Sequence, residues 1–303
     1  MVHFLINHYK NIINLMLVWI LLLVLNPATF ANHWAIMLAG LITGAYLFYF
    51  HYTNNRAQAQ SLAFEPLDVY KKALDERIVA CGLQPEDVRV RYAFADDGVA
   101  VALFNTIMID PFVWKHLDLD ENAQKAKQVI DIHVMPTLSQ EKKILLNRIY
   151  ETISTPVLEF IFKHELGHVV YNYSIKKIIV MGMIGFMLTV AGLETVLLCL
   201  PYMHSILAAA LGILVAGFVD LFLSYSSNVF FKYRHEVNAD LFAVKHSSQE
   251  EILAAAVFFE EYQKHANDYK KTLNIVQYLP QIIASGHPDG KARAAYLRKL
   301  TIN

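Results

Sequence analysis

Long apolar runs dominate the pattern of hydrophobic and polar residues along this chain. Four of them, at about residues 12–30, 34–51, 178–200 and 205–223, are long enough to cross a bilayer as helices, which takes about 20 residues. Short connections join the first run to the second and the third to the fourth. The first run resembles a signal peptide, but it is as long as or longer than a signal core, and another span follows at once. The pattern therefore predicts two retained transmembrane hairpins.

Lysine and arginine predict the orientation of these hairpins. The short connections at residues 31–33 and 201–204 contain no basic residue. Basic residues instead flank the outer ends of both hairpins, at Lys10, Arg56, Lys176, Lys177, Lys232 and Arg234. Cytoplasmic flanks carry the excess of such residues, so we expect the N-terminus, residues 52–177 and residues 232–303 to lie in the cytoplasm.

The polar parts of the chain show helical periodicity with a short β-rich stretch. Val88–Phe94 and Val99–Asp110 are rich in β-branched and aromatic residues, and Asp96-Asp97-Gly98 predicts a turn between them, so we expect a pair of strands. Helices are predicted at about residues 57–83, 117–150 with a loop near Pro136, 156–173, 233–245, from Ser247-Ser248 to about 265, and 289–300. The predicted fold class is mainly α with a small β-sheet (α+β).

These elements predict four consecutive parts. Residues 1–51 form an N-terminal transmembrane hairpin, and residues 52–177 form the first part of a cytoplasmic domain. Residues 178–231 form the second hairpin, and residues 232–303 complete the cytoplasmic domain.

Composition changes this picture little. The apolar runs account for the 55% hydrophobic content and the mean hydropathy of +0.34. A formal net charge of -1 gives no basis for nucleic-acid binding. The only two cysteines, Cys81 and Cys199, lie far apart, so neither a disulfide framework nor a cysteine-based metal site is expected.

A metal-binding motif stands out within the predicted helix at residues 156–173. The residues are His164-Glu165-Leu166-Gly167-His168. Side chains four residues apart lie on one face of a helix, so both imidazoles can bind one zinc ion. Zinc lowers the pKa of its water ligand toward about 7, and Glu165 is placed to act as the general base that takes a proton from that water.

A catalytic zinc needs a third protein ligand and one open position. The metzincin pattern requires a glycine and a histidine where this chain has Tyr171 and Ser174, so it is excluded. The gluzincin pattern requires a glutamate on a second helix, often followed four residues later by an aspartate. Glu236 and Asp240 fit this pattern. Asp240 would then accept a hydrogen bond from the non-liganding nitrogen of a zinc-bound histidine, with His164 as the first candidate.

Other assignments stay open at this point. His235 or His246 is an alternative third ligand, with Glu236 as a solvated helix charge. Glu194 and Asp220 lie in or near the last two spans, where ionisable groups are costly and often functional. The long separation of His168 from Glu236 is no objection, because the second hairpin returns the chain to its starting side.

With these residues in place, the chain resembles the membrane-embedded zinc metallopeptidases that include the bacterial heat-shock protease HtpX and the type I CAAX prenyl proteases. Three motifs carry the resemblance, in the same order as in HtpX. They are His164–His168, then Glu236-Val237-Asn238-Ala239-Asp240, then Ser285-Gly286-His287-Pro288 with Arg293 six residues after His287. Two spans precede the first motif and two more follow it, as in HtpX. Phe104-Asn105-Thr106 stands where the family often carries Asn-Ala-Phe.

The resemblance implies a membrane-integrated endopeptidase with a gluzincin-type cytoplasmic catalytic domain and one Zn²⁺ per chain. His164, His168 and Glu236 would be the metal ligands, and Asp240 would support them. The catalytic residues would be Glu165, His287 and Arg293, with His287 as a candidate to stabilise the oxyanion. Alternatively, His287-Pro288 would cap the last helix and Arg293 would anchor that helix by a salt bridge. The resemblance also implies location in a bacterial inner (cell) membrane, protein or peptide substrates, and a role in proteolytic quality control.

Two alternatives to this function remain. One is a prenyl-protein (CAAX-type) protease, although those enzymes are longer and have more spans. The other is an inactive, zinc-stabilised membrane scaffold. The intact Glu165 argues against a scaffold, because a structural zinc site has no use for that base. The strand at residues 99–110 could bind an extended substrate backbone as an added strand, or it could be an ordinary core strand.

Overall fold

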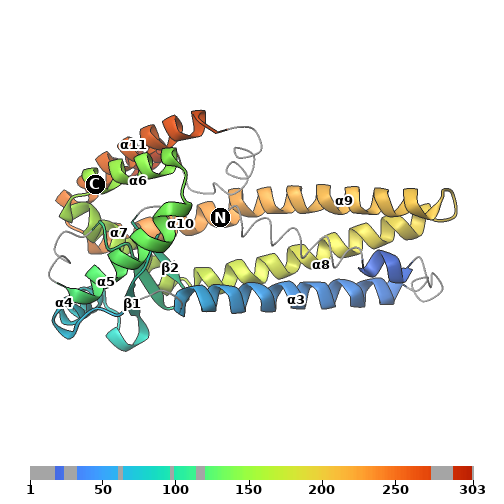
Figure 1. Cartoon of the computed structure of the whole chain (residues 1–303), viewed down its shortest axis with the longest axis horizontal. Helices are drawn as coiled ribbons and strands as arrows, with labels where there is room; N and C mark the ends of the chain where they lie inside the picture. The colour runs from blue at the N-terminus through green and yellow to red at the C-terminus, as the bar shows by residue number, and fades with distance from the viewer. Residues whose placement is uncertain are drawn as a thin grey trace. The chain divides into compact units, whose positions relative to one another are not determined.

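The computed structural model describes residues 18–23, 33–60, 64–95, 99–113, 120–273 and 289–301 (Figure 1). The chain divides into two compact units. The first comprises, among the described residues, those up to residue 54 together with residues 175–231. The second comprises residues 55–174, 232–273 and 289–301 of the described chain.

Three long apolar helices make up most of the first unit. They are α3 (His33–Gln60), α8 (Tyr173–Cys199) and α9 (Ser205–Ser226). Each is long and apolar enough to cross a membrane, and α9 continues through further helix to His246. These helices confirm three of the four predicted spans. Only residues 18–23 of the first predicted span are described, and they are helical.

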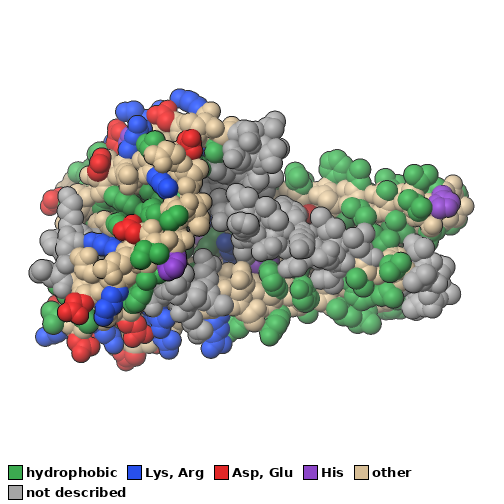
Figure 2. Space-filling view, viewed as in Figure 1, with side chains coloured by type: hydrophobic (Ala, Val, Ile, Leu, Met, Phe, Trp, Pro, Cys, Tyr) green, Lys and Arg blue, Asp and Glu red, His purple; other side chains and the backbone are tan. Residues whose placement is uncertain are grey.

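Small residues let these helices pack closely. A Cβ on Gly44 of α3 would lie 2.8 Å from the carbonyl oxygen of Gly182 of α8, and a Cβ on Gly212 of α9 would lie 2.8 Å from that of Gly192. Such contacts bring helix backbones together, as is typical of helices packed within membranes. The outer faces of the helices are apolar, as Figure 2 shows, with exposed side chains such as Leu41, Met183 and Phe218.

The second unit contains a mixed three-stranded sheet, β1 (Arg89–Tyr92), β2 (Ala100–Leu103) and β3 (Thr106–Ile109), in the order β1-β3-β2. β3 pairs parallel with β1 and antiparallel with β2. The small β-sheet predicted from the sequence is therefore confirmed, but it has three strands in the described residues rather than two, and the turn predicted at Asp96-Asp97-Gly98 lies outside those residues. The stretch at residues 99–110 is a hairpin rather than one strand, because a two-residue turn at Phe104-Asn105 reverses the chain.

Helices precede and follow this sheet in the chain, and α5 and α7 pack against it. Before it lie α4 (Asp68–Ala80) and the short 3₁₀ helix Pro85–Asp87. After it come α5 (Glu121–Val129), a π-helical turn (Ile130–Val134), a 3₁₀ turn (Met135–Thr137), α6 (Gln140–Thr152) and α7 (Thr155–Val170). The π-helical segment Ser227–Lys232 then leads into α10 (Tyr233–His246), which is followed by α11 (Gln249–Lys271) and α13 (Gly290–Thr301).

Two helix predictions need correction. The single helix expected at residues 57–83 is interrupted, because Pro66 disfavours helical backbone at the residue before it and Phe64 pairs with Tyr92 instead. The helix starting near Ser248 runs on to Lys271 rather than ending at about residue 265. The helix starts with a capping box between Ser248 and Glu251.

Helix packing in the first unit can be tested with two glycines. Gly44→Ala should lower the thermal unfolding midpoint in detergent by several degrees, because the new methyl group meets the backbone of α8. Gly217→Ala in α9 is the matched control, since a Cβ there meets nothing within 4 Å. Helix propensity favours alanine at both positions. Equal midpoints for the two variants would contradict the packing described.

Candidate metal centre

The predicted motif lies on α7, the most buried helix of the second unit. Pro156 stands in its first turn, where proline is tolerated, and the helix ends at Val170, two residues before Asn172, which has a φ of +52°. Apolar side chains such as Phe160 and Leu166 cover the other faces of α7, which packs against α10, α11, β2 and β3. The helix that carries the histidines is therefore fixed by core packing on several sides.

Gly167, within the motif, allows α10 to approach α7 unusually closely. A Cβ on Gly167 would lie 2.8 Å from the Cα of Ala239 and 3.2 Å from its carbonyl oxygen. Real Cβ atoms do not approach backbone this closely, so a larger residue at position 167 would push the helices apart. Along α7 this contact falls between His164 and His168, and along α10 it falls between Glu236 and Asp240.

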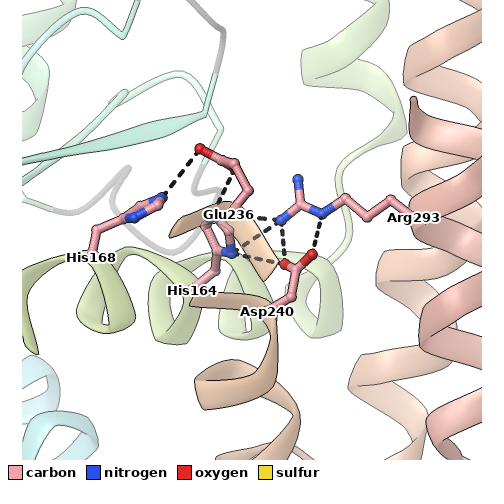
Figure 3. Close-up of polar contacts among 5 residues, drawn as sticks. All are labelled: His164, His168, Glu236, Asp240 and Arg293. Atoms are coloured by element: carbon pink, nitrogen blue, oxygen red, sulfur yellow. Dashed lines mark hydrogen bonds and ion pairs between the residues drawn. The ribbon is translucent and has the colours of Figure 1, made fainter. Parts of the chain in front are cut away.

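Three buried side chains converge at this contact (Figure 3). The Nε2 atom of His164 lies 3.4 Å from one carboxylate oxygen of Glu236, and the Nε2 atom of His168 lies 3.5 Å from the other. One potential ligand atom from each residue lies within 4.8 Å of the others. Among the described residues, this is the one group of three or more histidine, cysteine or acidic side chains with such spacing.

The donor set and its spacing fit zinc. Zn²⁺ binds imidazole nitrogen and carboxylate oxygen at about 2.0–2.2 Å, so ligands of a tetrahedral ion lie about 3.3–3.6 Å apart. The two nitrogen–oxygen distances at Glu236 fall in this range. Two imidazoles and one carboxylate also form a catalytic rather than a structural donor set.

Asp240 and Arg293 hold His164 on the Nδ1 side of its ring, whereas Nε2 faces Glu236. The Nδ1 atom of His164 lies 2.8 Å from a carboxylate oxygen of Asp240. Arg293, on α13, holds the same carboxylate with two hydrogen bonds, of which the one from Nε is 2.7 Å long. With a metal at Nε2, Nδ1 carries a proton and donates it to Asp240, which fixes the tautomer and the ring orientation.

The charges of this cluster are buried and balanced. Asp240 is 1% exposed and Arg293 9% exposed, and the guanidinium carbon lies 3.7 Å from the centre of the Phe259 ring. Burial and the Arg293 guanidinium lower the pKa of His164, but the Asp240 and Glu236 side chains outweigh them and raise it to about 9. A metal ion must therefore displace a proton from His164 at neutral pH, so metal binding should weaken in acid.

Glu165 lies between α7 and the sheet. Its carboxylate accepts a hydrogen bond from the backbone N–H of Ala102 on β2. Burial raises the pKa of Glu165 to about 7, against the opposing effect of His164. A carboxylate with a pKa near the working pH is suited both to accept and to return a proton.

The structure thus brings together six of the seven residues predicted as metal ligands, supporting residue or catalytic residues. His164, Glu165, His168, Glu236, Asp240 and Arg293 form one cluster, whereas His287 lies outside the described residues, as do Ser285, Gly286 and Pro288.

The alternative ligands, His235 and His246, are not members of this group. His235 packs its ring 5.1 Å from Tyr173, and His246 packs against Phe242. Neither belongs to the metal-spaced group.

Two neighbours of the centre were missed in the sequence. Tyr173 places its ring 5.0 Å from that of His168, and Ala102 donates to Glu165. Tyr173 is the last residue of the helix predicted at residues 156–173, but five residues after His168 it does not share the helix face of the motif, so the sequence gave only a weak signal. Nothing in the sequence could mark Ala102, because its role depends on its backbone and on the packing of β2 against α7.

A His-Glu-x-x-His helix packed against a second helix that supplies a glutamate is the arrangement of a metallopeptidase centre. Comparison with protein families agrees with this class. Residues 122–301 match Peptidase family M48, and the chain belongs to this family. Comparisons with curated proteins and with solved structures found no match. The family as a whole is zinc-dependent, which agrees with the His, His and Glu group.

The identity of the third ligand can be tested through metal content. Glu236→Gln should lower zinc affinity by 100-fold or more, because the carboxylate between the two imidazoles loses its charge. His235→Gln, one residue away, is the matched control and should retain one zinc per chain. Metal content after dialysis against a weak chelator measures both. Loss of zinc from His235→Gln with retention in Glu236→Gln would reverse the assignment.

Proposed function

We propose that this protein is a membrane-integrated, zinc-dependent endopeptidase with Glu165 as its general base. The observation that carries the proposal is the buried group of His164, His168 and Glu236 with Glu165 beside it, at the edge of a sheet. Membership of Peptidase family M48 supports the reaction class.

The roles of the side chains follow from their positions. A zinc ion held by His164, His168 and Glu236 would supply Lewis acidity that activates water and polarises a peptide carbonyl. Glu165 would take a proton from the attacking water at its carboxylate and pass it to the leaving amine. Asp240, held by Arg293, keeps His164 in the tautomer that offers Nε2 to the metal. Arg293 is therefore a positioning residue in this mechanism, and His287 stays a prediction.

The edge strand β2 would bind the substrate backbone. The Asp110 N–H donates to the Val99 carbonyl, and bonded and non-bonded pairs alternate along an antiparallel ladder. Ala100 and Ala102 therefore direct their backbone groups away from β3. Since Ala102 also donates to Glu165, a peptide added to this edge would pass directly beside the general base.

The cellular setting is also part of the proposal. Three helices long and apolar enough to span a bilayer support integration into a membrane, which we assign to a bacterial inner membrane. The distribution of basic residues supports a catalytic domain on the cytoplasmic side. Misfolded membrane or cytoplasmic proteins would then be the substrates, because backbone pairing to an edge strand accepts many sequences.

A direct test compares the cleavage of casein by detergent-purified wild type and Glu165→Gln. The variant should lose at least 100-fold in kcat/KM while keeping its zinc, because the base is lost but the ligands remain. Glu159→Gln is the matched control on the same helix. Glu159 pairs with Arg77 at 2.8 Å, outside the centre, and its loss should leave activity unchanged.

The outcomes separate the candidate functions. Cleavage that is abolished by a chelator and by Glu165→Gln supports the endopeptidase. Zinc-loaded wild type that cleaves neither casein nor unfolded membrane proteins would favour the scaffold, and cleavage of prenylated peptides alone would favour a CAAX-type protease. Equal activity of wild type and Glu165→Gln would contradict the mechanism.

A further inference from the structure

Two residues with positive φ lie at or near one hydrogen bond close to the centre. Phe104, in the turn between β2 and β3, and Asn172, between α7 and α8, have φ of +55° and +52°. They are the non-glycine residues with positive φ in the described part of the chain. The backbone N–H of Phe104 donates to the hydroxyl of Ser174, two residues after Asn172, at 2.9 Å.

The strain at Phe104 is unusual for its residue type. A two-residue turn with positive φ at its first position alone is of type II′, where glycine is preferred. Asn105, the second position, does not share the positive φ. A bulky aromatic residue in this conformation is an outlier that persists only where its surroundings hold it. The hydroxyl of Ser174, a residue only 6% exposed, is the partner that holds the backbone of Phe104.

The position of this hydrogen bond along β2 gives it a second consequence. Ala100 and Ala102 direct their backbone groups to the free edge of β2, and the N–H of Phe104 follows next on the same side. The N–H of Ala102 donates to Glu165 and the N–H of Phe104 donates to Ser174, so both donors at this end of the edge are engaged within the protein. On this edge an extended peptide would therefore pair with the backbone groups of Ala100 and with the carbonyl of Ala102.

We propose that Ser174 is a substrate-positioning residue, which holds the end of β2 through the Phe104 N–H and so aligns the edge strand for peptide binding beside Glu165. This inference rests on the proposed peptidase function. Ser174 does not belong to the metal-spaced group and acts through the strand. Its loss should therefore weaken substrate binding and leave the chemical step and the metal in place.

The first test measures steady-state kinetics on a fluorogenic peptide taken from a casein sequence that the wild type cleaves. Ser174→Ala should raise KM by about 3- to 10-fold, the factor that one ordinary hydrogen bond contributes. It should change kcat by less than 2-fold and keep one zinc per chain. Ser174→Thr retains a hydroxyl and should restore KM. Ser139→Ala is the matched control, because it removes a hydroxyl–amide bond of the same kind at the start of α6, 3.2 Å long.

A second pair of variants separates positioning from general destabilisation. Glycine adopts positive φ without strain, so Phe104→Gly makes the turn independent of Ser174. In that background, Ser174→Ala should raise KM by less than 2-fold. The same increase in both backgrounds, or an unchanged KM in Ser174→Ala, would overturn the inference while the peptidase function stands. Absence of Glu165-dependent cleavage by the wild type would overturn the proposed function and this inference together.

Discussion

The close approach of α7 and α10 at Gly167 and Ala239 is the constraint on which the rest of the site depends. The ligands come from two helices that are far apart in sequence, and a metal ion tolerates errors of only a few tenths of an ångström in its ligand positions. Glycine at position 167 removes the one side chain that would separate these backbones. Glu236 can then reach both imidazoles within 3.5 Å.

Balanced burial of charge is the second requirement. An unpaired buried charge is strongly destabilising, yet His164, Glu165, Glu236, Asp240 and Arg293 are all buried. The structure meets the cost by direct pairing, with a guanidinium from α13 on the carboxylate that supports His164. The last helix of the chain thus completes the centre electrostatically. The strained turn at Phe104 is a separate sign that the geometry near the centre is fixed, because strain tends to be kept where function requires a fixed geometry.

The chemistry of the centre could be predicted from the sequence because it depends on spacing within single helices. The four-residue separations of His164 from His168 and of Glu236 from Asp240 each specify one helical face. The sheet was harder, because the turn at Phe104-Asn105 lacks the glycine that normally marks a two-residue hairpin. Parallel pairing of β1 with β3 and the bond from Ala102 to Glu165 depend on tertiary packing, which no local pattern records.

The zinc dissociation constant of Gly167→Ala, measured by competition with a chelator, tests the central constraint most directly. Alanine is intrinsically favoured over glycine in a helix by about 1 kcal/mol, so propensity alone predicts an unchanged or better-formed site. The close contact of α7 with α10 predicts instead that affinity falls at least tenfold in a folded protein, because the new methyl group meets the backbone of Ala239. Wild-type zinc affinity in a folded Gly167→Ala protein would contradict this constraint.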